Sequence, residues 1–408
     1  MAEREWREAS DMRTSIVSLG LILLSAGLLR FWALGSGVPE AVGRDESVIM
    51  DLAVGMMKSG NLDPGFFDHG GLYIYTQLIV VTLRFMSGAL DGLWSSLDQV
   101  GSADFYVWGR ATTAALGAVT VLLVYLIGMR WGSRHALLAA GLMAVMPTHV
   151  LFSHRVATGV PATLCVTLTW LLCLRANESG RLAAFAWAGA AAGLAASITY
   201  GAGMSLGLPL LTAWMTLEAA PSRLRCGLGA IGAFVTAFML GSPYTLLNLP
   251  RFLEAFAHMA AAGHAAGRGG TPFLTEIATV MGWPATMLAI AGLIMGAVRA
   301  VKGPGRPRWA LALVAPLLLH RLADSPFVAD SEALLFVLPF LCVVAAAAVV
   351  SGVSLLRRFD IARMPRTVLI AALTVAALLP PSIAAIRVDR ELGRQPSSAH
   401  PAITTPRR

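Results

Sequence analysis

The residues best suited to chemistry lie in a polar loop after the first apolar segment. The loop opens with Gly43-Arg44-Asp45-Glu46-Ser47 and closes with Phe66-Phe67-Asp68-His69-Gly70-Gly71. Five carboxylates fall between residues 45 and 68, although only 13% of the chain is charged. Carboxylates fixed in one place can accept and return protons, and a nearby histidine can do the same or bind an anion. We therefore expect this loop to carry the active site.

The rest of the chain is typical of a protein whose solvent is lipid. Hydrophobic residues make up 56% of the sequence, and the mean hydropathy is +0.69. Apolar runs of roughly 20 residues, enough to cross about 30 Å of hydrocarbon, recur along the chain. They lie near 14–34, 71–90, 107–129, 134–153, 156–174, 182–200, 203–218, 224–243, 275–298, 309–323, 331–356 and 367–386. The sequence therefore predicts an all-α, polytopic membrane protein with about 11–12 transmembrane helices.

The distribution of arginine predicts which loops lie on the same side of the membrane. By the positive-inside rule, the cytoplasmic connections are Arg130/Arg134, Arg175/Arg181, Arg223/Arg225, Arg299 to Arg308 and Arg357 to Arg366. The loops near 36–70, 154–156, 199–204, 244–274 and 320–330 then face outside. One conflict remains, because the runs 71–90 and 107–129 must both start outside. Either 71–90 does not cross, or one charge assignment is wrong.

Several classes of function are disfavoured by the composition. The net charge of +8 comes mostly from arginine at helix ends, so it does not indicate nucleic-acid binding. The four cysteines show no paired spacing and are expected to pack within apolar segments. Arg4, Arg7 and Arg13 precede the first run without a small-residue cleavage site, which favours a retained anchor.

We divide the chain into three parts. Residues 1–270 form the predicted catalytic membrane module, with the outside loops 36–70 and 244–272. Residues 271–386 add C-terminal transmembrane helices, and 387–408 form a polar tail.

Both long outside loops contain an amphipathic stretch that should lie in the membrane interface. In the first, apolar residues repeat at helical spacing from Val48 to Met57. In the second, Pro250 opens a similar stretch that carries His258 on its polar face. The simpler interpretation of the acidic pair is that Asp45 caps the first helix and Glu46 complements its dipole.

Further ionisable residues could complete a site from later loops. Arg268 lies in a glycine-rich stretch after His258, and Arg321 lies in a third outside connection. A mobile loop with these groups could close over an anionic ligand. A simpler interpretation is also open. The glycine-rich stretch could be a solvated linker, and the arginines could extend their charged ends toward the membrane interface.

The order of these segments resembles the GT-C superfamily of membrane glycosyltransferases, in particular the protein-mannosyltransferase and aminoarabinose-transferase-like (family 39-like) proteins that use polyprenyl-phosphate sugars. The resemblance rests on Asp45-Glu46, on the run from Phe67 to Tyr75, on Arg110 with the segment 117–125, on the segment 144–154, and on Ser242-Pro243-Tyr244.

The resemblance implies an inverting sugar transfer from a polyprenyl-phosphate donor at the outer face of a plasma membrane. Asp45 inherits the role of general base, with Glu46 beside it in the catalytic pair. Substrate and donor phosphate are expected to contact Asp68, His69, Tyr73, His258, Arg268 and Arg321. A divalent metal ion on Glu46 and His258 is a further option. The acceptor could be a glycan, a lipid or a protein.

Three positions depart from the family pattern. An acidic residue is missing before Pro161, where the chain has Gly159-Val160. A lysine is replaced near Thr199-Tyr200, and a late Arg-Tyr motif reads Glu332-Ala333. Two alternatives therefore stay open: a catalytically inactive relative that binds or assembles partners, and a membrane transporter or lipid flippase.

Overall fold

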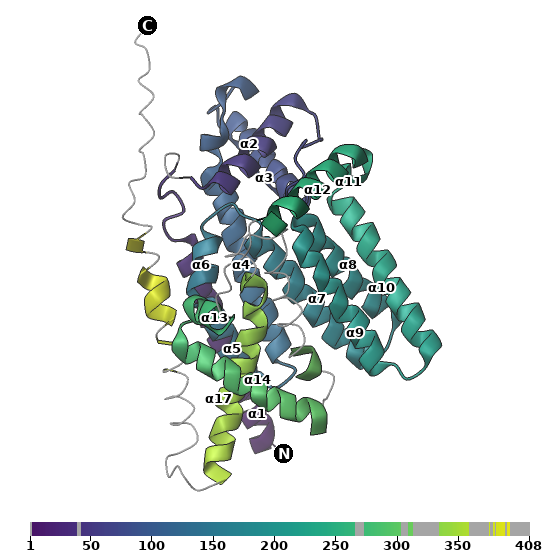
Figure 1. The fold of residues 1–408 in the computed structure, drawn as a ribbon. Coiled ribbons are helices and arrows are strands. Elements are labelled where there is room, and N and C mark those ends of the chain that lie inside the picture. Colours follow the sequence, from purple (N-terminus) through teal and green to yellow (C-terminus); the bar gives the residue numbers. More distant parts are fainter. Residues whose placement is uncertain are drawn as a thin grey trace.

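The computed structural model describes residues 2–38, 42–265, 273–302, 309–312 and 334–358, together with 375, 378–379, 381–387 and 390–391. Within these residues the regular elements are all helices (Figure 1). The predicted all-α class is confirmed. The spans expected at 309–323 and 367–386 lie largely outside the described residues, and so does most of the tail.

A bundle of helices forms the body of the molecule (Figure 1). Its members are α1 (Ala2–Phe31), α4 (Tyr106–Gly128), α5 (Ser133–Ala144), α6 (Pro147–Ser153), α7 (Gly159–Ser179), α8 (Leu182–Ile198), α9 (Gly207–Thr216), α10 (Ala220–Gly241), α13 (Phe273–Met281), α14 (Trp283–Lys302) and α17 (Leu338–Arg358).

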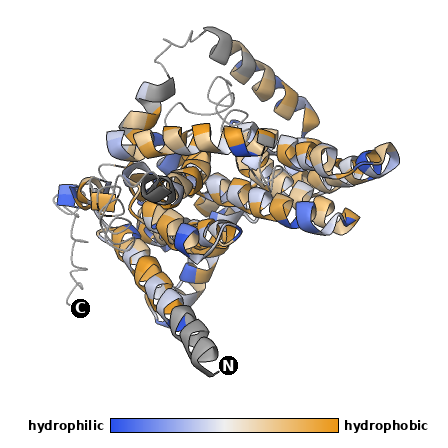
Figure 2. Ribbon diagram, turned by 90° about the horizontal axis from the view of Figure 1, so that it is seen from below, coloured by the Kyte–Doolittle hydropathy of each residue, from blue (hydrophilic) through white to orange (hydrophobic). Residues whose placement is uncertain are grey.

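By length and composition, six of the described helices could cross a membrane, the helix Leu72–Leu90 among them, or seven if the bent pair α5 and α6 is one span. That pair bends by 57° just before Pro147, which opens α6 because a proline is well accommodated in a first helical turn. Apolar residues cover much of the bundle (Figure 2). The protein is a multi-pass membrane protein.

Small residues allow α8 and α10 to pack backbone to backbone. A Cβ atom at Gly189 would lie 2.1 Å from the carbonyl oxygen of Ala230, and one at Gly193 would lie 2.3 Å from that of Phe234. Such close approach of two helices over small residues is typical of helix packing in membranes. Because Gly189 faces Ala230 and Gly193 faces Phe234, α8 and α10 run in parallel. Their C-termini therefore lie on the same side of the bundle.

The basic connections within the described residues gather at the opposite end, where the N-terminus lies (Figure 1). Arg130 after α4 forms an ion pair with Glu178 at the end of α7. Arg299 near the end of α14 donates to the hydroxyl of Ser351 on α17, 3.1 Å away. The grouping predicted from the arginines agrees with this arrangement.

The other end of the bundle is covered by a second set of helices and 3₁₀ turns. They are α2 (Arg44–Ser59), α3 (Leu72–Leu90), η1 (Leu97–Gln99), η2 (Ser102–Asp104), η3 (Tyr200–Leu206), α11 (Tyr244–Leu247) and α12 (Leu249–Ala265). We call this the loop end. The two amphipathic stretches predicted from the sequence form α2 and α12.

Helix α3 resolves the conflict over 71–90. It begins beside the ends of α8 and α10, where Gly70 and Gly71 donate to the Ile198 carbonyl and the Ser242 hydroxyl. It ends in a connection whose Trp94 packs on Phe105, directly before α4. Both ends of α3 therefore lie at the loop end, and the helix does not cross the bundle.

Candidate active site

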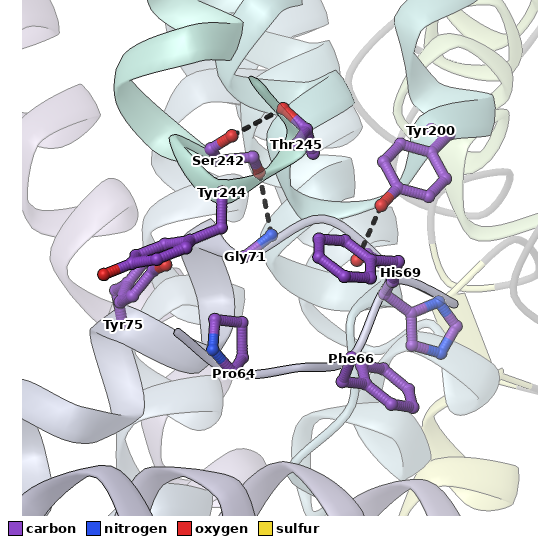
Figure 3. Close-up of a pocket in the computed structure, with 10 residues that line it drawn as sticks. Pro64, Phe66, His69, Gly71, Tyr75, Tyr200, Ser242, Tyr244 and Thr245 are labelled. Carbon is purple, nitrogen blue, oxygen red and sulfur yellow. Dashed lines mark hydrogen bonds between the residues drawn. The ribbon is translucent and has the colours of Figure 1, made fainter. Parts of the chain in front are cut away.

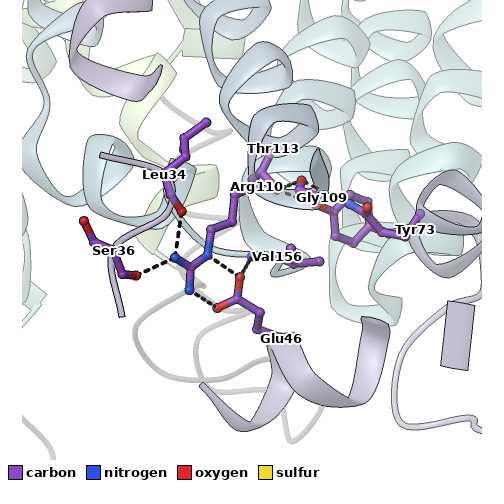
Figure 4. Close-up of polar contacts among 9 residues, drawn as sticks. Leu34, Ser36, Glu46, Tyr73, Gly109, Arg110, Thr113 and Val156 are labelled. Carbon is purple, nitrogen blue, oxygen red and sulfur yellow. Dashed lines mark hydrogen bonds and ion pairs between the residues drawn. The ribbon is translucent and has the colours of Figure 1, made fainter. Parts of the chain in front are cut away.

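The loop end is organised around a buried ion pair between Glu46 and Arg110. Arg110 Nε donates to Glu46 Oε1 at 2.7 Å, and Arg110 Nη2 donates to Oε2 at 2.9 Å (Figure 4). Glu46 is 3% exposed and Arg110 is 5% exposed. This two-point geometry is the strongest form of a carboxylate–guanidinium contact, and it orients both side chains.

The same pair joins three separate segments. Arg110 Nη1 donates to the carbonyl oxygens of Leu34 and Ser36, at 2.9 and 2.7 Å. Glu46 Oε1 also accepts the backbone N–H of Val156, at 3.1 Å. The start of α2 is thereby fixed to the ends of α1 and α6 and to α4 (Figure 4).

Asp45 has the opposite environment from its neighbour. It is exposed, and it lies in the first turn of α2. The helix begins at Arg44, its N-cap is Gly43, and no side chain caps it. The interpretation of Asp45 as a cap is therefore wrong, because Asp45 is already inside the helix. Its carboxylate lies in the first turn, near the positive end of the helix dipole.

His69 lies within reach of the charge on Asp45. Burial lowers the pKa of His69, while the negative charges of Asp45 and Asp68 raise it in opposition. Its Nδ1 atom is buried and has no hydrogen-bond partner among the residues that the structure describes. Asp68 itself is exposed. Asp45, Asp68 and His69 thus form one group, with a neutral imidazole that still has an unused nitrogen.

The glycines after His69 bring the loop against the bundle. A Cβ at Gly70 would lie 2.1 Å from the carbonyl oxygen of Ser197, so a larger residue has no room there. The N–H of Gly71 donates to the Ser242 hydroxyl at 2.8 Å, and that hydroxyl donates to the Ser197 carbonyl at 3.1 Å. These contacts fix His69 above the ends of α8 and α10.

A small pocket opens beside these contacts (Figure 3). It is lined by Pro64, Phe66, Phe67, His69, Gly71, Tyr75, Tyr200, Ser242, Tyr244 and Thr245. Tyr200 donates to the backbone carbonyl of His69 at 3.0 Å, and Tyr75 donates to that of Leu62 at 3.2 Å. The lining combines aromatic faces with hydroxyls, but the cavity volume is only about 10 Å³, which is room for about one water molecule and not for a sugar ring.

The remaining predicted residues are placed differently. Tyr73 is 1% exposed, and its hydroxyl bonds to Thr113 inside the bundle, so it packs α3 on α4 (Figure 4). His258 is exposed on α12. Arg268, Arg321 and the departure at Glu332 lie outside the described residues.

The predicted metal site has no assembled ligand set in the described part of the chain. No group of three or more His, Cys, Asp or Glu side chains there is placed to hold a metal ion. Both oxygens of Glu46 already accept hydrogen bonds from Arg110. Glu46 would have to leave that ion pair to bind a metal, so the residues present do not fit the metal site on Glu46 and His258.

Sequence reasoning missed the hydroxyls around the pocket. Tyr75, Ser242 and Tyr244 stood in segments that carried the resemblance, but nothing in their spacing indicated that they meet. Tyr200 stood out only because it follows Thr199, where a lysine was expected. Its contact with His69 joins residues 131 positions apart, which periodicity cannot show.

Comparison with known proteins identifies the class of fold. The crystal structure of the Archaeoglobus fulgidus oligosaccharyltransferase in the apo form matches with a TM-score of 0.59 at 14% identity, over 92% of this chain and 56% of that chain. The same protein in complex with Zn and sulfate matches with a TM-score of 0.57 at 15% identity, over 90% and 53%. ArnT from Cupriavidus metallidurans bound to undecaprenyl phosphate matches with a TM-score of 0.55 at 15% identity, over 92% and 72%.

The chain has the fold of the GT-C membrane glycosyltransferases, and the predicted resemblance is confirmed. The sequence model of the dolichyl-phosphate-mannose-protein mannosyltransferases matches residues 106–246. No curated protein sequence matches significantly. The chain spans about half the length of the oligosaccharyltransferase.

Proposed function

We propose that the protein is an inverting glycosyltransferase that moves a sugar from a polyprenyl-phosphate donor to an acceptor hydroxyl. The observation that carries the proposal is the contrast between the two neighbouring carboxylates. Glu46 is buried in an ion pair, whereas Asp45 is exposed and lies within electrostatic range of His69 at the loop end. The fold shared with ArnT, whose structure holds undecaprenyl phosphate, supports the donor class.

In the proposed reaction Asp45 is the general base. Its carboxylate accepts the proton of the acceptor hydroxyl as the hydroxyl oxygen attacks the anomeric carbon. The bond between that carbon and the donor phosphate oxygen breaks, and the electron pair leaves with the polyprenyl phosphate. Attack opposite to the leaving phosphate inverts the anomeric centre.

His69 is the proposed contact for the leaving phosphate. Its Nδ1 is free to donate to an anion once the ring takes up a proton. The lowered pKa keeps the ring neutral in the free protein near pH 7, and a bound phosphate would raise it. The ring then supplies positive charge only when the donor is present. Asp68 completes the polar rim on the same side.

The loop end faces the outside of a plasma membrane in this proposal, and the basic end faces the cytoplasm. The bilayer surrounds the bundle, so the polyprenyl chain can reach the pocket from the lipid. The acceptor is a glycan, lipid or protein whose hydroxyl can approach Asp45. No nucleic acid takes part.

Release of polyprenyl phosphate tests the proposal. The purified protein would be given a panel of undecaprenyl-phosphate sugars, with membrane extract as the source of acceptors. Asp45→Asn should lower release by about 10²–10⁴-fold, the usual contribution of a general base. Asp98→Asn removes an exposed carboxylate elsewhere at the loop end and serves as the matched control.

Other outcomes would support the alternatives. Binding of a donor with no release from either protein would indicate an inactive relative that binds or assembles partners. Movement of a labelled lipid across the membrane, without a new covalent product, would indicate a transporter or flippase. Equal release from wild type and Asp45→Asn would remove Asp45 as the base.

A further inference from the structure

A groove between α9 and α10 lies apart from the candidate active site (Figure 1). Its volume is about 560 Å³, within the range of about 300–1,000 Å³ that is usual for ligand pockets. Its lining on α10 extends from Ala220 to Ile231, about 16 Å along the helix axis. Most of the lining is apolar, and it includes Leu210 and Trp214 of α9 and Gly227 and Leu228 of α10. A groove of this length and composition suits an extended hydrocarbon chain.

The groove lies on the lipid-facing side of α10. This helix is one of the candidate spans, and only 22% of its most apolar stretch is buried within the described molecule. Trp214 and Leu228, from the two sides of the groove, are both more than half exposed. Side chains at such positions of a span contact hydrocarbon in a bilayer. An empty groove there would lose dispersion contacts, so a lipid chain fills it.

One end of the groove carries a fixed positive charge. Arg223 lies in the first turn of α10 and is itself part of the groove lining. Its Nε atom donates to the Leu217 carbonyl, and its guanidinium lies over the Trp214 ring, 5.9 Å from the ring centre. Its Nη atoms form no hydrogen bond within the described part of the chain. The guanidinium is therefore held in place with donors left for an anion.

The surrounding charges also favour an anion at Arg223. Arg225 adds a second positive charge two positions later, and Glu218 is the acid nearest in the sequence. Glu218 is exposed, and no ion pair joins it to Arg223 in the described part of the chain. No side chain caps the start of α10, where Ala219 is the N-cap, so the positive end of the helix dipole adds to the two arginines.

The depth of Arg223 in the membrane matches that of a lipid head group. The candidate span of α10 begins at Ala220, so Arg223 lies near the level where hydrocarbon meets head groups. Trp214 is in contact with it, and tryptophan is enriched at that level. This is the basic end of the bundle, which the proposed orientation places in the cytoplasmic leaflet. Anionic lipids give that leaflet its negative surface potential.

We propose that the groove between α9 and α10 binds one anionic glycerophospholipid. Its phosphate accepts hydrogen bonds from the Nη atoms of Arg223, and one acyl chain lies along the groove past Gly227 toward Ile231. The cation and the apolar lining belong to one cavity, so a single lipid molecule contacts both. The site lies at the end of the bundle opposite Asp45, and the proposal is independent of sugar transfer.

Lipid binding by the full-length protein tests the proposal. Delipidated protein in a neutral detergent would be titrated with phosphatidylglycerol or phosphatidylcholine, and bound lipid would be counted by native mass spectrometry. Wild type should retain one phosphatidylglycerol and bind phosphatidylcholine more weakly. Arg223→Gln should weaken phosphatidylglycerol binding about tenfold or more, as expected for a lost charge-assisted contact. Arg223→Lys should recover part of the affinity.

Two matched pairs of variants on α10 separate this site from general effects of charge and packing. Arg225→Gln removes the same charge from a position outside the groove lining, and it should bind like wild type. Gly227→Leu places a side chain in the groove and should lose the retained lipid. Gly232→Leu should keep it, since Gly232 is not part of the lining and a Cβ there meets no described atom within 4 Å. The glycine pair also serves if Arg223→Gln does not fold.

Three results would overturn the proposal. The first is equal retention of both phospholipids by wild type. The second is equal phosphatidylglycerol binding by the two members of either pair, because neither the charge of Arg223 nor the space beside Gly227 would then be specific to the groove. The third is undecaprenyl phosphate displacing phosphatidylglycerol with higher affinity, which would assign the groove to the proposed donor.

Discussion

The two long segments at the loop end are attached to the molecule in different ways. The first, residues 42–71, is joined to the bundle by the Glu46–Arg110 ion pair and by directional hydrogen bonds at Gly70 and Gly71. The second, α11 and α12, contacts the first through aromatic rings and through one hydrogen bond, which Asn248 between the two helices donates to Asp63 at 3.1 Å. Phe252 lies 6.2 Å from Phe67 and 5.7 Å from Tyr200, between ring centres.

This difference indicates that the two segments have different roles. Hydrogen bonds and ion pairs have strict geometry, so they keep a carboxylate in place to within fractions of an ångström. Ring contacts tolerate sliding, so α12 can shift without losing all of its stabilisation. The proposed base is on the fixed segment. The segment that can move lies beside it and could admit a substrate.

Breaking the ion pair should have the largest effect on stability. In Glu46→Ala, the guanidinium of Arg110 stays buried without its partner, and such a loss usually costs about 3–5 kcal/mol. The free energy of unfolding in detergent would show it. Glu254→Ala, an exposed acid on α12, is the matched control and should change little. A loss below about 1 kcal/mol for Glu46→Ala would mean that the pair does not fix α2.

Crowding the contact at Gly70 should be the next largest change. In Gly70→Ala the new methyl group would meet the Ser197 carbonyl, and such overpacking usually costs about 1–3 kcal/mol. The segment would move away from α8, so turnover should fall together with stability. Gly43→Ala is the comparison, since a Cβ there meets no described atom within 4 Å. Similar behaviour of the two variants would contradict the close approach.

Loosening α12 should have a moderate effect that leaves the first segment unchanged. Phe252→Ala removes ring contacts with Phe67, Tyr200 and Phe256, each worth about 0.5–1.5 kcal/mol. Hydrogen exchange should rise in α12 but not in α2. Faster exchange in both would show that the two segments open as one unit, and would remove the distinction between them.

The smallest expected effect is on the pH dependence of donor binding. Because the pKa of His69 is lowered in the free protein and a bound phosphate raises it, binding takes up a proton. Donor affinity should therefore rise a few-fold as the pH falls from about 7.5 to 6. His69→Gln should flatten this profile without changing the fold. A profile that persists in His69→Gln would assign the proton to another group.

The sequence predicted the helices and their amphipathic faces, because those depend on periodicity within one segment. It could not separate Asp45 from Glu46. The two are neighbours in a polar loop, and only the direction of α2 decides which of them faces the bundle. Arg110 carried part of the resemblance, but it lies 64 positions from Glu46 and nothing in the spacing paired the two.

Hydropathy also could not decide whether α3 crosses. A helix that lies along the loop end against lipid has the same apolar composition as a span. What separates the two is where Gly71 and Trp94 dock, and both contacts are tertiary. The arginine pattern did reveal the conflict, and the structure resolved it in favour of a helix that does not cross.

A paired measurement on the adjacent carboxylates tests the central claim most directly. Unfolding free energy and release of undecaprenyl phosphate would be measured for Asp45→Asn and Glu46→Gln in parallel. The account predicts that Asp45→Asn keeps its stability within about 0.5 kcal/mol and loses turnover, since it is a surface change. Glu46→Gln should lose stability, because it leaves Arg110 buried with its charge unpaired. Full turnover in Asp45→Asn, or a stable Glu46→Gln, would contradict the assignment of the two residues.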